Sequence, residues 1–343
     1  MIPSSMRFLA RLAAAVAVTA SCLTSALAEV SEVRIGSQWG TSYLPFDVME
    51  SMKLVEKHAR LRGLGDVKVR WSRLSGASAA NDGILSGDLH FTATAVPSLV
   101  LLHAKTRDNP KLAIKGVGAF GTAPIYLNTN NPNIHTLRDY TDQSRIAVAA
   151  VKISGVALML QMAAEAEFGA GQYAKLDPLT VTMSQPNSYI AMTAGGAGQI
   201  DSHVATPPYS ITELARPGIH RVVNMNEVLG GNTTFLVTYT TSGFRDANPK
   251  TYAAYVDALK EAMTFINANK RAAAKIYLES SHDKSTPLEE LVQQLDNPDM
   301  TFTVTPQNTM KFANFMYRTG VVKTKVDSWK DLFFPEVHDL PGS

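Results

Sequence analysis

Downstream of residue 29, hydrophobic and polar positions follow two different periods. Short alternating runs rich in β-branched side chains predict strands, and longer runs with apolar residues three or four positions apart predict helices. We expect strands over residues 33–37, 67–71, 89–94, 145–151, 179–183, 200–204 and 221–224. We expect helices over residues 45–60, 77–85 and 97–106 and over almost all of 249–320. Strands that alternate with helices are typical of parallel sheets covered by helices, so the sequence predicts an α/β fold.

Two stretches of the chain share one pattern, which divides the α/β region in two. Gly87 and Gly198 each close a helical run, a strand follows, and a proline stands ten positions after each glycine, at Pro97 and Pro208. We therefore expect two similar α/β lobes with mostly parallel sheets, joined by two crossing segments. The first lobe begins with residues 29–122, and the second comprises residues 123–233. The crossings are expected at 123–128 and 234–240, and residues 234–343 would then add helices that pack on the first lobe.

The N-terminus has the pattern of a secretory signal peptide over residues 1–28. Arg7 precedes a short apolar run, and the Ala-Leu-Ala of residues 26–28 forms a cleavage site. Removing these 28 of the 343 residues leaves 315, in which 30 basic side chains balance 30 acidic ones. It also removes Cys22, the only cysteine, so we expect a cysteine-free chain exported to the periplasm. The alternative is a lipoprotein anchored through Cys22, although residues 19–21 lack the usual leucine.

Composition narrows the class of protein further. The chain is 45% hydrophobic and 18% charged, an ordinary globular mixture. Its most apolar later segment, residues 93–102, is interrupted by Pro97 and Ser98, so no membrane-spanning helix is predicted there. The near-balance of 32 basic and 30 acidic residues gives no reason to expect nucleic acid. We expect a monomeric protein that binds a small-molecule ligand.

The loops that follow the predicted strands hold the candidate binding residues. Ligands bind at the carboxyl ends of strands in open α/β sheets, so these loops of both lobes should face one cleft. Several loops end in Ser, Thr or Gly at a helix start, where free backbone N–H groups and the helix dipole suit an anion. The pattern therefore predicts a small anionic or strongly polar ligand. The candidate ligand-binding residues are Gln38, Trp39, Thr41, Tyr43, Ser75, Ser98, Ser154, His203 and Tyr209.

Some of these residues have structural interpretations that the sequence leaves open. Trp39 and Tyr43 could pack against the first helix instead of contacting a ligand. Ser154 could be a helix N-cap, a role that is compatible with ligand contact. His203 could be a hydrogen-bonded structural histidine. Arg73 and Lys152 flank cleft loops and could balance a ligand charge, with solvated positions as the alternative.

Motifs for metals, cofactors and catalysis are weak. Residues 116–121 match G-x-G-x-x-G, but extended chain follows where a dinucleotide site needs a helix, so we expect only a bend near the hinge. The eight histidines are scattered singly, without the spacing of metal ligands. Nothing resembles a nucleophile motif in a usable context. The sequence therefore predicts no metal, no cofactor and no enzymatic activity.

Several segments together resemble one family. They are the signal peptide and residues 33–40, 83–91, 145–148 and 154–155, with Gly-Gln-Ile-Asp at 198–201 and Pro-Pro-Tyr at 207–209. Through these diffuse motifs, essentially the whole mature chain resembles the periplasmic substrate-binding proteins of ABC importers of the nitrate/sulfonate/taurine type. The resemblance implies the type II periplasmic binding protein fold, two hinge-bending lobes and delivery of the ligand to a permease in the inner membrane.

The same superfamily supplies the alternative function, an enzyme of the thiamine-pyrimidine-synthase-like type. The cysteine-rich motif of that enzyme is missing from this chain, and the predicted signal peptide indicates export. The resemblance therefore favours a solute receptor over an enzyme.

Overall fold

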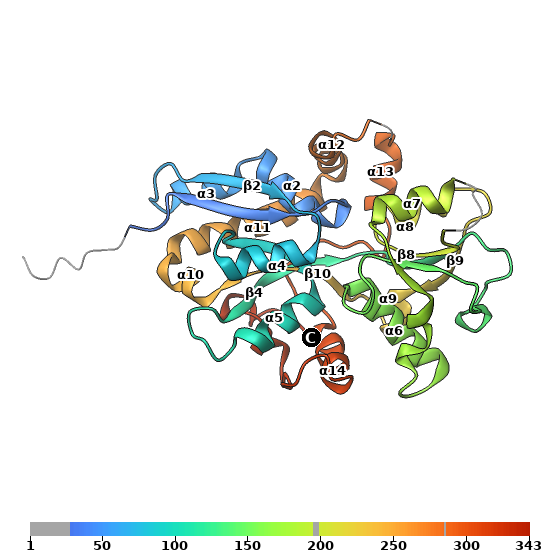
Figure 1. Cartoon of the computed structure of the whole chain (residues 1–343). Coiled ribbons are helices and arrows are strands. Elements are labelled where there is room, and N and C mark those ends of the chain that lie inside the picture. Colours follow the sequence, from blue (N-terminus) through green and yellow to red (C-terminus); the bar gives the residue numbers. More distant parts are fainter. Residues whose placement is uncertain (1–27, 195–198, 285) are drawn as a thin grey trace, which may run out of the picture.

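Two α/β lobes lie side by side, each built on a five-stranded sheet with helices against its faces (Figure 1). The computed structural model describes residues 28–194, 199–284 and 286–343. The predicted signal peptide, up to residue 27 and with Cys22, therefore lies outside the described residues. The two mixed sheets confirm the predicted α/β fold of two lobes.

Lobe 1 has the strand order β2-β1-β3-β10-β4. Strands β1, β2 and β3 pair in parallel, and β10 runs antiparallel to both β3 and β4. The strands are β1 (Glu32–Ser37), β2 (Lys68–Arg73), β3 (Phe91–Ala95), β4 (Ile114–Thr122) and β10 (Thr234–Thr241). Its helices before residue 249 are η1 (Thr41–Tyr43), α2 (Leu44–Ser51), α3 (Leu54–Leu61), α4 (Ala77–Ser86), α5 (Val96–Thr106) and α10 (Ser242–Ala247).

Lobe 2 repeats this arrangement with the strand order β7-β6-β8-β5-β9. Strands β6, β7 and β8 are parallel, and β5 runs antiparallel to β8 and β9. The strands are β5 (Tyr126–Thr129), β6 (Ile146–Val148), β7 (Thr180–Thr182), β8 (Ser202–Ala205) and β9 (His220–Asn224). The helices are η2 (Leu137–Asp139), α6 (Gly155–Phe168), η3 (Tyr173–Leu179), α7 (Gln185–Thr193), α8 (Tyr209–Thr212) and α9 (Met225–Val228).

The chain crosses between the lobes at two places, which differ in part from the expected ones. Residues 123–125 form the first crossing, because β4 ends in lobe 1 at Thr122 and β5 begins in lobe 2 at Tyr126. Residues 229–233 form the second. The expected crossing at 234–240 is instead strand β10, which lies between β3 and β4 in the sheet of lobe 1. Its alternating apolar and β-branched residues are compatible with a strand inside a sheet and equally with an extended linker.

The helix expected over residues 45–60 is broken in two. Helix α2 ends at Ser51 and α3 begins at Leu54, and Lys53 between them has a positive φ of 50°. The spacing of apolar residues does not reveal this interruption, because both helices direct an apolar face toward the core. The stretch 249–320 is also less helical than expected, since irregular chain separates α13 from α14.

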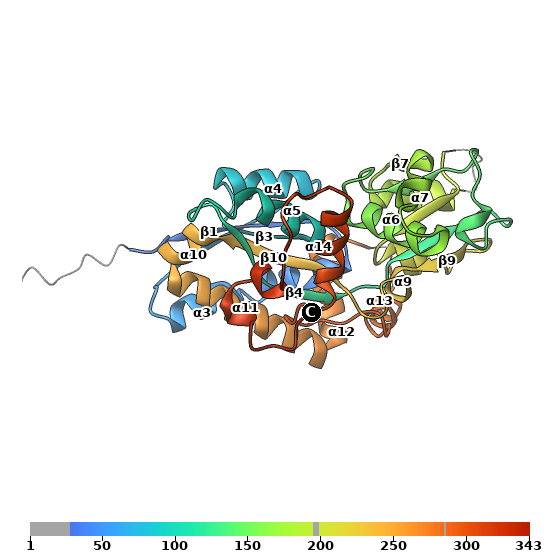
Figure 2. The ribbon, with the colours of Figure 1, turned by 90° about the horizontal axis from the view of Figure 1, so that it is seen from below.

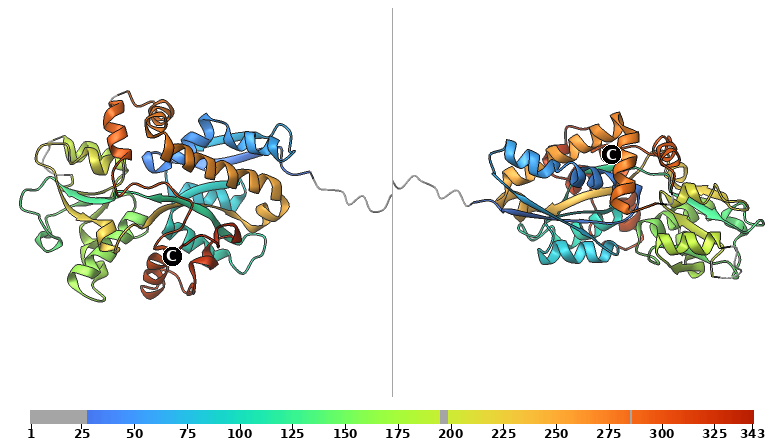
Figure 3. Two further views of the ribbon diagram at one scale, coloured as in Figure 1. Left: turned by 180° about the vertical axis from the view of Figure 1, so that it is seen from behind. Right: turned by 90° about the horizontal axis from the view of Figure 1, so that it is seen from above.

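The segments after residue 249 pack largely on lobe 1, where α11 contacts α2 and α3, and α14 contacts α5 (Figure 3). They are α11 (Pro249–Ala268), α12 (Lys270–Ser281), α13 (Leu288–Leu295), α14 (Thr309–Arg318), α15 (Trp329–Leu332) and η4 (Pro335–Val337). No helix among the described residues is long and apolar enough to cross a membrane.

The G-x-G-x-x-G stretch is strand β4 and not the expected bend. The C-terminal segment covers its outer edge, because Ala119 donates a backbone hydrogen bond to Val304 and Phe334 donates one to Gly116. At Gly121 the φ is +104°, and an added Cβ would lie 1.8 Å from the Thr301 carbonyl oxygen. The motif therefore reflects close backbone approach at a covered sheet edge.

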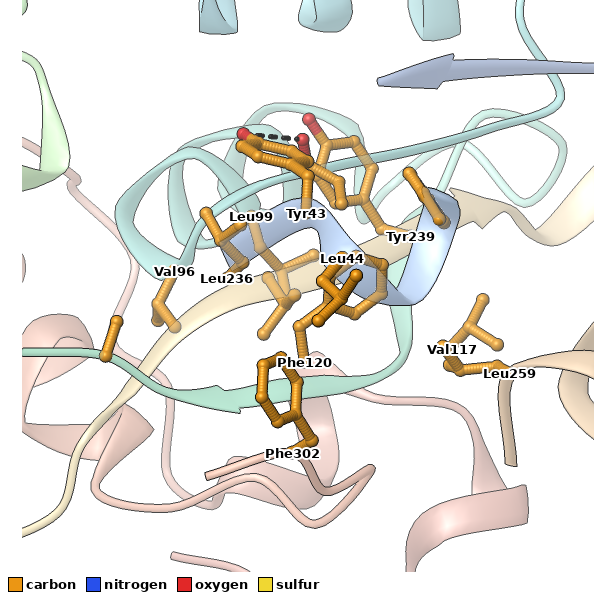
Figure 4. Packing of buried hydrophobic residues seen from close by; sticks show 14 of the residues in the cluster. Tyr43, Leu44, Val96, Leu99, Val117, Phe120, Leu236, Tyr239, Leu259 and Phe302 are labelled. Atoms are coloured by element: carbon orange, nitrogen blue, oxygen red, sulfur yellow. Dashed lines mark hydrogen bonds between the residues drawn. The ribbon is translucent and has the colours of Figure 1, made fainter. Parts of the chain in front are cut away.

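A buried cluster beneath the strand-end loops of lobe 1 holds those loops in place. Tyr43 and Leu44, at the start of α2, pack with Phe120 of β4 and Leu236 of β10 (Figure 4). All four side chains are at least nine-tenths buried. Tyr43 and Leu44 thus anchor the end of the first loop of the candidate site in the core.

Candidate functional site

The carboxyl ends of the parallel strands of both lobes meet in one region, which we call the lobe junction. It comprises the loops after β1, β2 and β3 in lobe 1 and after β6, β7 and β8 in lobe 2, and Figure 2 shows the two lobes meeting there. A Cβ added at Gly155, the first residue of α6, would lie 2.6 Å from the Ala95 Cβ at the end of β3. One added at Gly40 would lie 3.0 Å from the Pro207 carbonyl oxygen. The two lobes are therefore in direct contact.

The loop after β1 contains four of the predicted site residues and two unpartnered hydroxyls. Gln38 Nε2 and the Tyr43 hydroxyl both donate to the carbonyl of Ala93, each over 3.4 Å. The hydroxyls of Thr41 and Ser42 are buried and make no hydrogen bond to any residue that the structure describes. The loop therefore has hydrogen-bond donors and acceptors that the protein itself does not use. A buried hydroxyl without a partner costs roughly 1–3 kcal/mol, and a ligand that bonds to it would remove this cost.

A small cavity lies beside one of these hydroxyls, at the hinge between the lobes. Ser42 lines it together with Phe120, Ala123 and Phe235, and its volume of ≈ 10 Å³ admits about one water molecule.

Trp39 projects from the same loop and is 54% exposed. The guanidinium of Arg73, at the end of β2, lies 5.2 Å from the centre of the indole ring. A large aromatic ring left half open beside a cation provides a surface for a ligand with an apolar body or an anionic group. The sequence left Arg73 open between balancing a ligand charge and a solvated position, and in the structure its side chain is only 22% exposed. The signal that could have found it is its place as the last residue of a strand that ends at the junction.

Arg73 is held by two carboxylates of α2. It forms a hydrogen-bonded ion pair with Asp47, and its Nη2 lies 3.8 Å from Glu50 Oε2. Burial raises the pKa of Asp47 to about 6, although Arg73 opposes the shift. Burial also raises the pKa of Glu50. These two carboxylates were not anticipated from the sequence, because each lies on the apolar-periodic helix α2.

Four helices begin directly after parallel strands and place their N-termini at the junction. Helices α4, α5 and α7 begin there without a side-chain cap. Ser154 caps α6, because its hydroxyl accepts a hydrogen bond from Ala157 N over 3.3 Å and donates one to the Ala150 carbonyl over 2.8 Å. The uncapped N–H groups and aligned dipoles favour a negatively charged ligand.

Three other predicted residues lie near the junction with little fixed chemistry. Ser75 is exposed before α4, and Ser98 is partly buried in the first turn of α5. Neither side chain makes a hydrogen bond to a described residue. Tyr209, at the start of α8, is partly buried with its ring 5.5 Å from that of Tyr189. Burial raises the pKa of its hydroxyl, which therefore stays protonated as a hydrogen-bond donor.

His203 occupies a different environment from the one the sequence suggested. Its side chain is completely buried inside lobe 2, where Nδ1 lies 2.7 Å from Glu213 Oε1. Asn128, opposite it on β5, donates to the other oxygen of Glu213 over 2.8 Å. The structural interpretation of His203 therefore fits better than ligand contact, because Glu213 holds its ring in the interior of lobe 2.

Contacts outside the junction also join the two lobes. Arg318 of α14 forms an ion pair with Glu165 of α6, with Nη1 2.6 Å from Oε1. Asp299 of the C-terminal segment accepts hydrogen bonds from Tyr126 and Asn224 of lobe 2, over 3.1 and 3.0 Å. The C-terminal segment thus connects both lobes at the hinge.

Within residues 28–194, 199–284 and 286–343, no three His, Cys, Asp or Glu side chains gather as a metal site requires. The junction instead combines loop hydroxyls, helix N-termini, an open aromatic ring and one arginine. Two lobes that meet through the strand ends of similar sheets form the kind of junction at which open α/β sheets bind ligands.

No protein-family model and no curated protein matches the sequence. Solved structures with the same fold do match. The alkanesulfonate-binding protein SsuA from Xanthomonas axonopodis pv. citri, bound to MOPS, has a TM-score of 0.67 and 17% identity over 87% of this chain and 96% of its own. The periplasmic aliphatic sulphonate-binding protein SsuA from Escherichia coli has a TM-score of 0.66 and 16% identity over 90% and 98%.

The periplasmic nitrate-binding protein NrtA from Synechocystis PCC 6803 has a TM-score of 0.67 and 12% identity over 88% of this chain and 84% of its own. This chain therefore has the fold of the periplasmic binding proteins of ABC-type importers. The fold implied by the sequence resemblance is confirmed, and sulfonate- and nitrate-binding proteins are among its structural neighbours.

Proposed function

We propose that this chain is an extracytoplasmic solute receptor of an ABC importer. It binds a small anionic or polar organic solute of the sulfonate, nitrate or taurine kind between its lobes and delivers it to a permease of the inner membrane. The observation that carries the proposal is the lobe junction, where the buried, unpartnered hydroxyls of Thr41 and Ser42 lie in a loop that contacts lobe 2. The structural likeness to an alkanesulfonate-binding and a nitrate-binding protein supports the solute class.

Ligand contacts in this proposal come from both lobes. The residues involved are Gln38, Trp39, Thr41, Tyr43, Ser75 and Ser98 of lobe 1 and Ser154 and Tyr209 of lobe 2. A solute that touches both lobes binds the closed arrangement better than an open one, and this differential contact shifts the population toward closure. The permease would then recognise the closed form. The receptor acts as a monomer in the periplasm.

The first experiment is a thermal-shift screen of residues 29–343, stripped of carried-over ligand by partial unfolding and dialysis. The panel contains ethanesulfonate, taurine, MOPS, nitrate, bicarbonate, aromatic acids, amino acids and pyridoxal phosphate. A solute at 100 times its Kd adds ~2.7 kcal/mol of stability, on the order of 5 °C for a chain of this size. A shift with pyridoxal phosphate alone would favour the enzyme alternative, and no shift with any sulfonate or nitrate would contradict the proposed solute class.

A variant of Thr41 tests the site itself. Thr41→Val removes an unpartnered hydroxyl while keeping its volume, so the ligand-free protein should melt at the same or a higher temperature. Affinity for the solute found in the screen should fall about tenfold, because the lost hydrogen bond contributes ~1.5 kcal/mol. Thr264→Val, on the exposed face of α11, is the matched control and should leave affinity unchanged. Unaltered binding by Thr41→Val would remove this loop from the site.

A further inference from the structure

Arg73 joins several polar groups at the lobe junction. It is the last residue of β2 and stands in register with Ser37, the last residue of β1. Its Nη1 donates to the Ser37 hydroxyl and to the Gln38 carbonyl, each over 3.1 Å, and its Nη2 pairs with Asp47. The side chain is still 22% exposed, and its guanidinium lies over the ring of Trp39. Arg73 thus holds the loop after β1 and also reaches the surface of the junction.

We propose that Arg73 recognises the anionic group of the solute and that Asp47 competes with the solute for it as an internal counter-ion. The inference rests on the proposed function, because it assigns the charge recognition of that same site. It makes the capture of anions dependent on whether Asp47 carries a charge, and it predicts stronger capture in mildly acidic medium.

The donors of Arg73 leave room for a second acceptor. A guanidinium has five N–H donors arranged to pair with an oxyanion in a bidentate manner. Nε makes no hydrogen bond to any described residue, and the second donor of Nη2 faces Glu50 only at 3.8 Å. An oxyanion on the exposed side of the guanidinium could therefore be bound by Nε and Nη2 without breaking the bonds to Ser37 and Gln38. The loop would stay in place while the charge partner changes.

The local charges oppose anion binding as long as both carboxylates are ionised. Arg73 carries one positive charge, and Asp47 and Glu50 carry two negative ones. Asp47 is 1% exposed, so its charge acts on Arg73 with little screening by solvent. When Asp47 is neutral, Arg73 loses its closest counter-ion and the group as a whole is no longer negative. The helix N-termini at the junction then act on the anion together with Arg73.

The surroundings of Asp47 allow this change at moderate pH. The charged or titratable groups that face it are Arg73 of β2, Glu50 of its own helix and Tyr277 of α12. Burial raises the pKa of Asp47 to about 6 even with Arg73 beside it. Asp47 is therefore ionised at pH 7.5 and neutral at pH 5, and anion affinity should rise as the pH falls through this interval.

Quenching of Trp39 fluorescence by iodide tests the inference without a known ligand. Iodide probes for an anion site, and neutral acrylamide reports exposure alone. Trp39 is the exposed tryptophan, and the signal of Trp71 and Trp329 is subtracted with a Trp39→Phe variant. The ratio of iodide to acrylamide quenching should rise at least twofold between pH 7.5 and pH 5, with a midpoint near 6. The wild-type pH series requires no substitution in the charged group.

Variants then separate the two partners. Asp47→Asn should show the high ratio at pH 7.5 and no step on acidification, and Arg73→Gln should show a low ratio at both values. Arg73→Lys, which keeps the charge but loses the fork, should lie between them. Asp66→Asn removes an exposed carboxylate before β2 that no described contact joins to Arg73, so it should behave like the wild type. Equal ratios in the wild type and Arg73→Gln would overturn the inference.

Solute titrations complete the test. Ethanesulfonate and nitrate should bind the wild type at least fivefold more tightly at pH 5 than at pH 7.5, and Asp47→Asn equally well at both. If the quenching results hold but no solute binds the wild type, the proposed receptor function fails while the anion site stands. If solutes bind with an affinity independent of pH and of Arg73, the function stands and the role of Arg73 is refuted.

Discussion

Gly155 offers a test of whether the two lobes must close on the ligand. It begins α6 in lobe 2, and an added Cβ would lie 2.6 Å from the Ala95 Cβ of lobe 1, with Phe235 and Pro97 at 3.8 and 4.0 Å. Carbon atoms in contact are about 3.5–4.0 Å apart, so Gly155→Ala requires the lobes to separate by about 1 Å at this point. Overpacking of this kind costs ~1–3 kcal/mol. Because the cost falls on the arrangement in which the two lobes touch, solute affinity should drop about 5- to 150-fold if the solute binds between them.

The fold of each lobe should not suffer from the same change. Alanine within a helix is more favourable than glycine by ~0.5–1 kcal/mol, so ligand-free Gly155→Ala should melt at the same or a higher temperature. Ala95→Gly removes the opposing Cβ, and the double variant should recover most of the wild-type affinity. Isothermal titration with the solute from the screen measures both effects.

If Gly155→Ala binds the solute as tightly as the wild type, contact between the lobes does not contribute to binding. A loss of affinity that Ala95→Gly does not restore would lead to the same conclusion, because the effect would then come from α6 itself and not from contact across the junction.

Other predictions concern the stability of the two lobes. The Arg318–Glu165 ion pair should show a coupling of ~0.5–1 kcal/mol in a double-mutant cycle at low salt and almost none in 1 M NaCl, since both side chains meet water. Burial lowers the pKa of His90 to about 4, so the unfolded state binds a proton first and stability should fall as the pH drops from about 6.5 to about 4. The loss of stability is on the order of 1 kcal/mol, because the partial exposure of the ring reduces it. In urea unfolding, His90→Asn should make the free energy of unfolding nearly independent of pH over that interval. An unchanged pH dependence would contradict the role of His90. The carboxylate of Glu29 accepts hydrogen bonds from Lys250 N, Thr251 N and the Thr251 hydroxyl at the start of α11, so Glu29→Ala should cost ~1–2 kcal/mol in thermal unfolding and Glu29→Gln less.

Much of the fold could be predicted from the sequence because each sheet is formed from short β-branched runs followed by helices. All seven expected strands are present, with ends shifted by a few residues. The errors occur where one pattern fits two structures. Residues 234–240 have the composition of a strand, and only the pairing with β3 and β4 shows that they belong to the sheet and not to the crossing. The break at Lys53 leaves no mark in the apolar period.

The loops of the candidate site could be predicted from the sequence, because they follow the ends of the predicted strands. Thr41 and Tyr43 could be located because loops after parallel strands meet at one edge. The sequence allowed a hydrogen-bonded structural role for His203 but did not reveal its partner, because Glu213 lies ten residues away on the following helix turn. The role of Arg73 depends on Asp47, a helical residue distant in sequence, and a pair of this kind becomes visible only when β2 and α2 are placed together.

Binding of the solute between the lobes is tested most directly by a crystal structure. Crystals of residues 29–343 would be grown with the solute that gives the largest thermal shift. We predict electron density at the lobe junction, within hydrogen-bonding distance of Thr41 in lobe 1 and in contact with the N-terminus of α6 in lobe 2. Density elsewhere would contradict this prediction. An example is the ≈ 510 Å³ hollow beside Arg62 and Glu336 on lobe 1, occupied while the junction holds no solute.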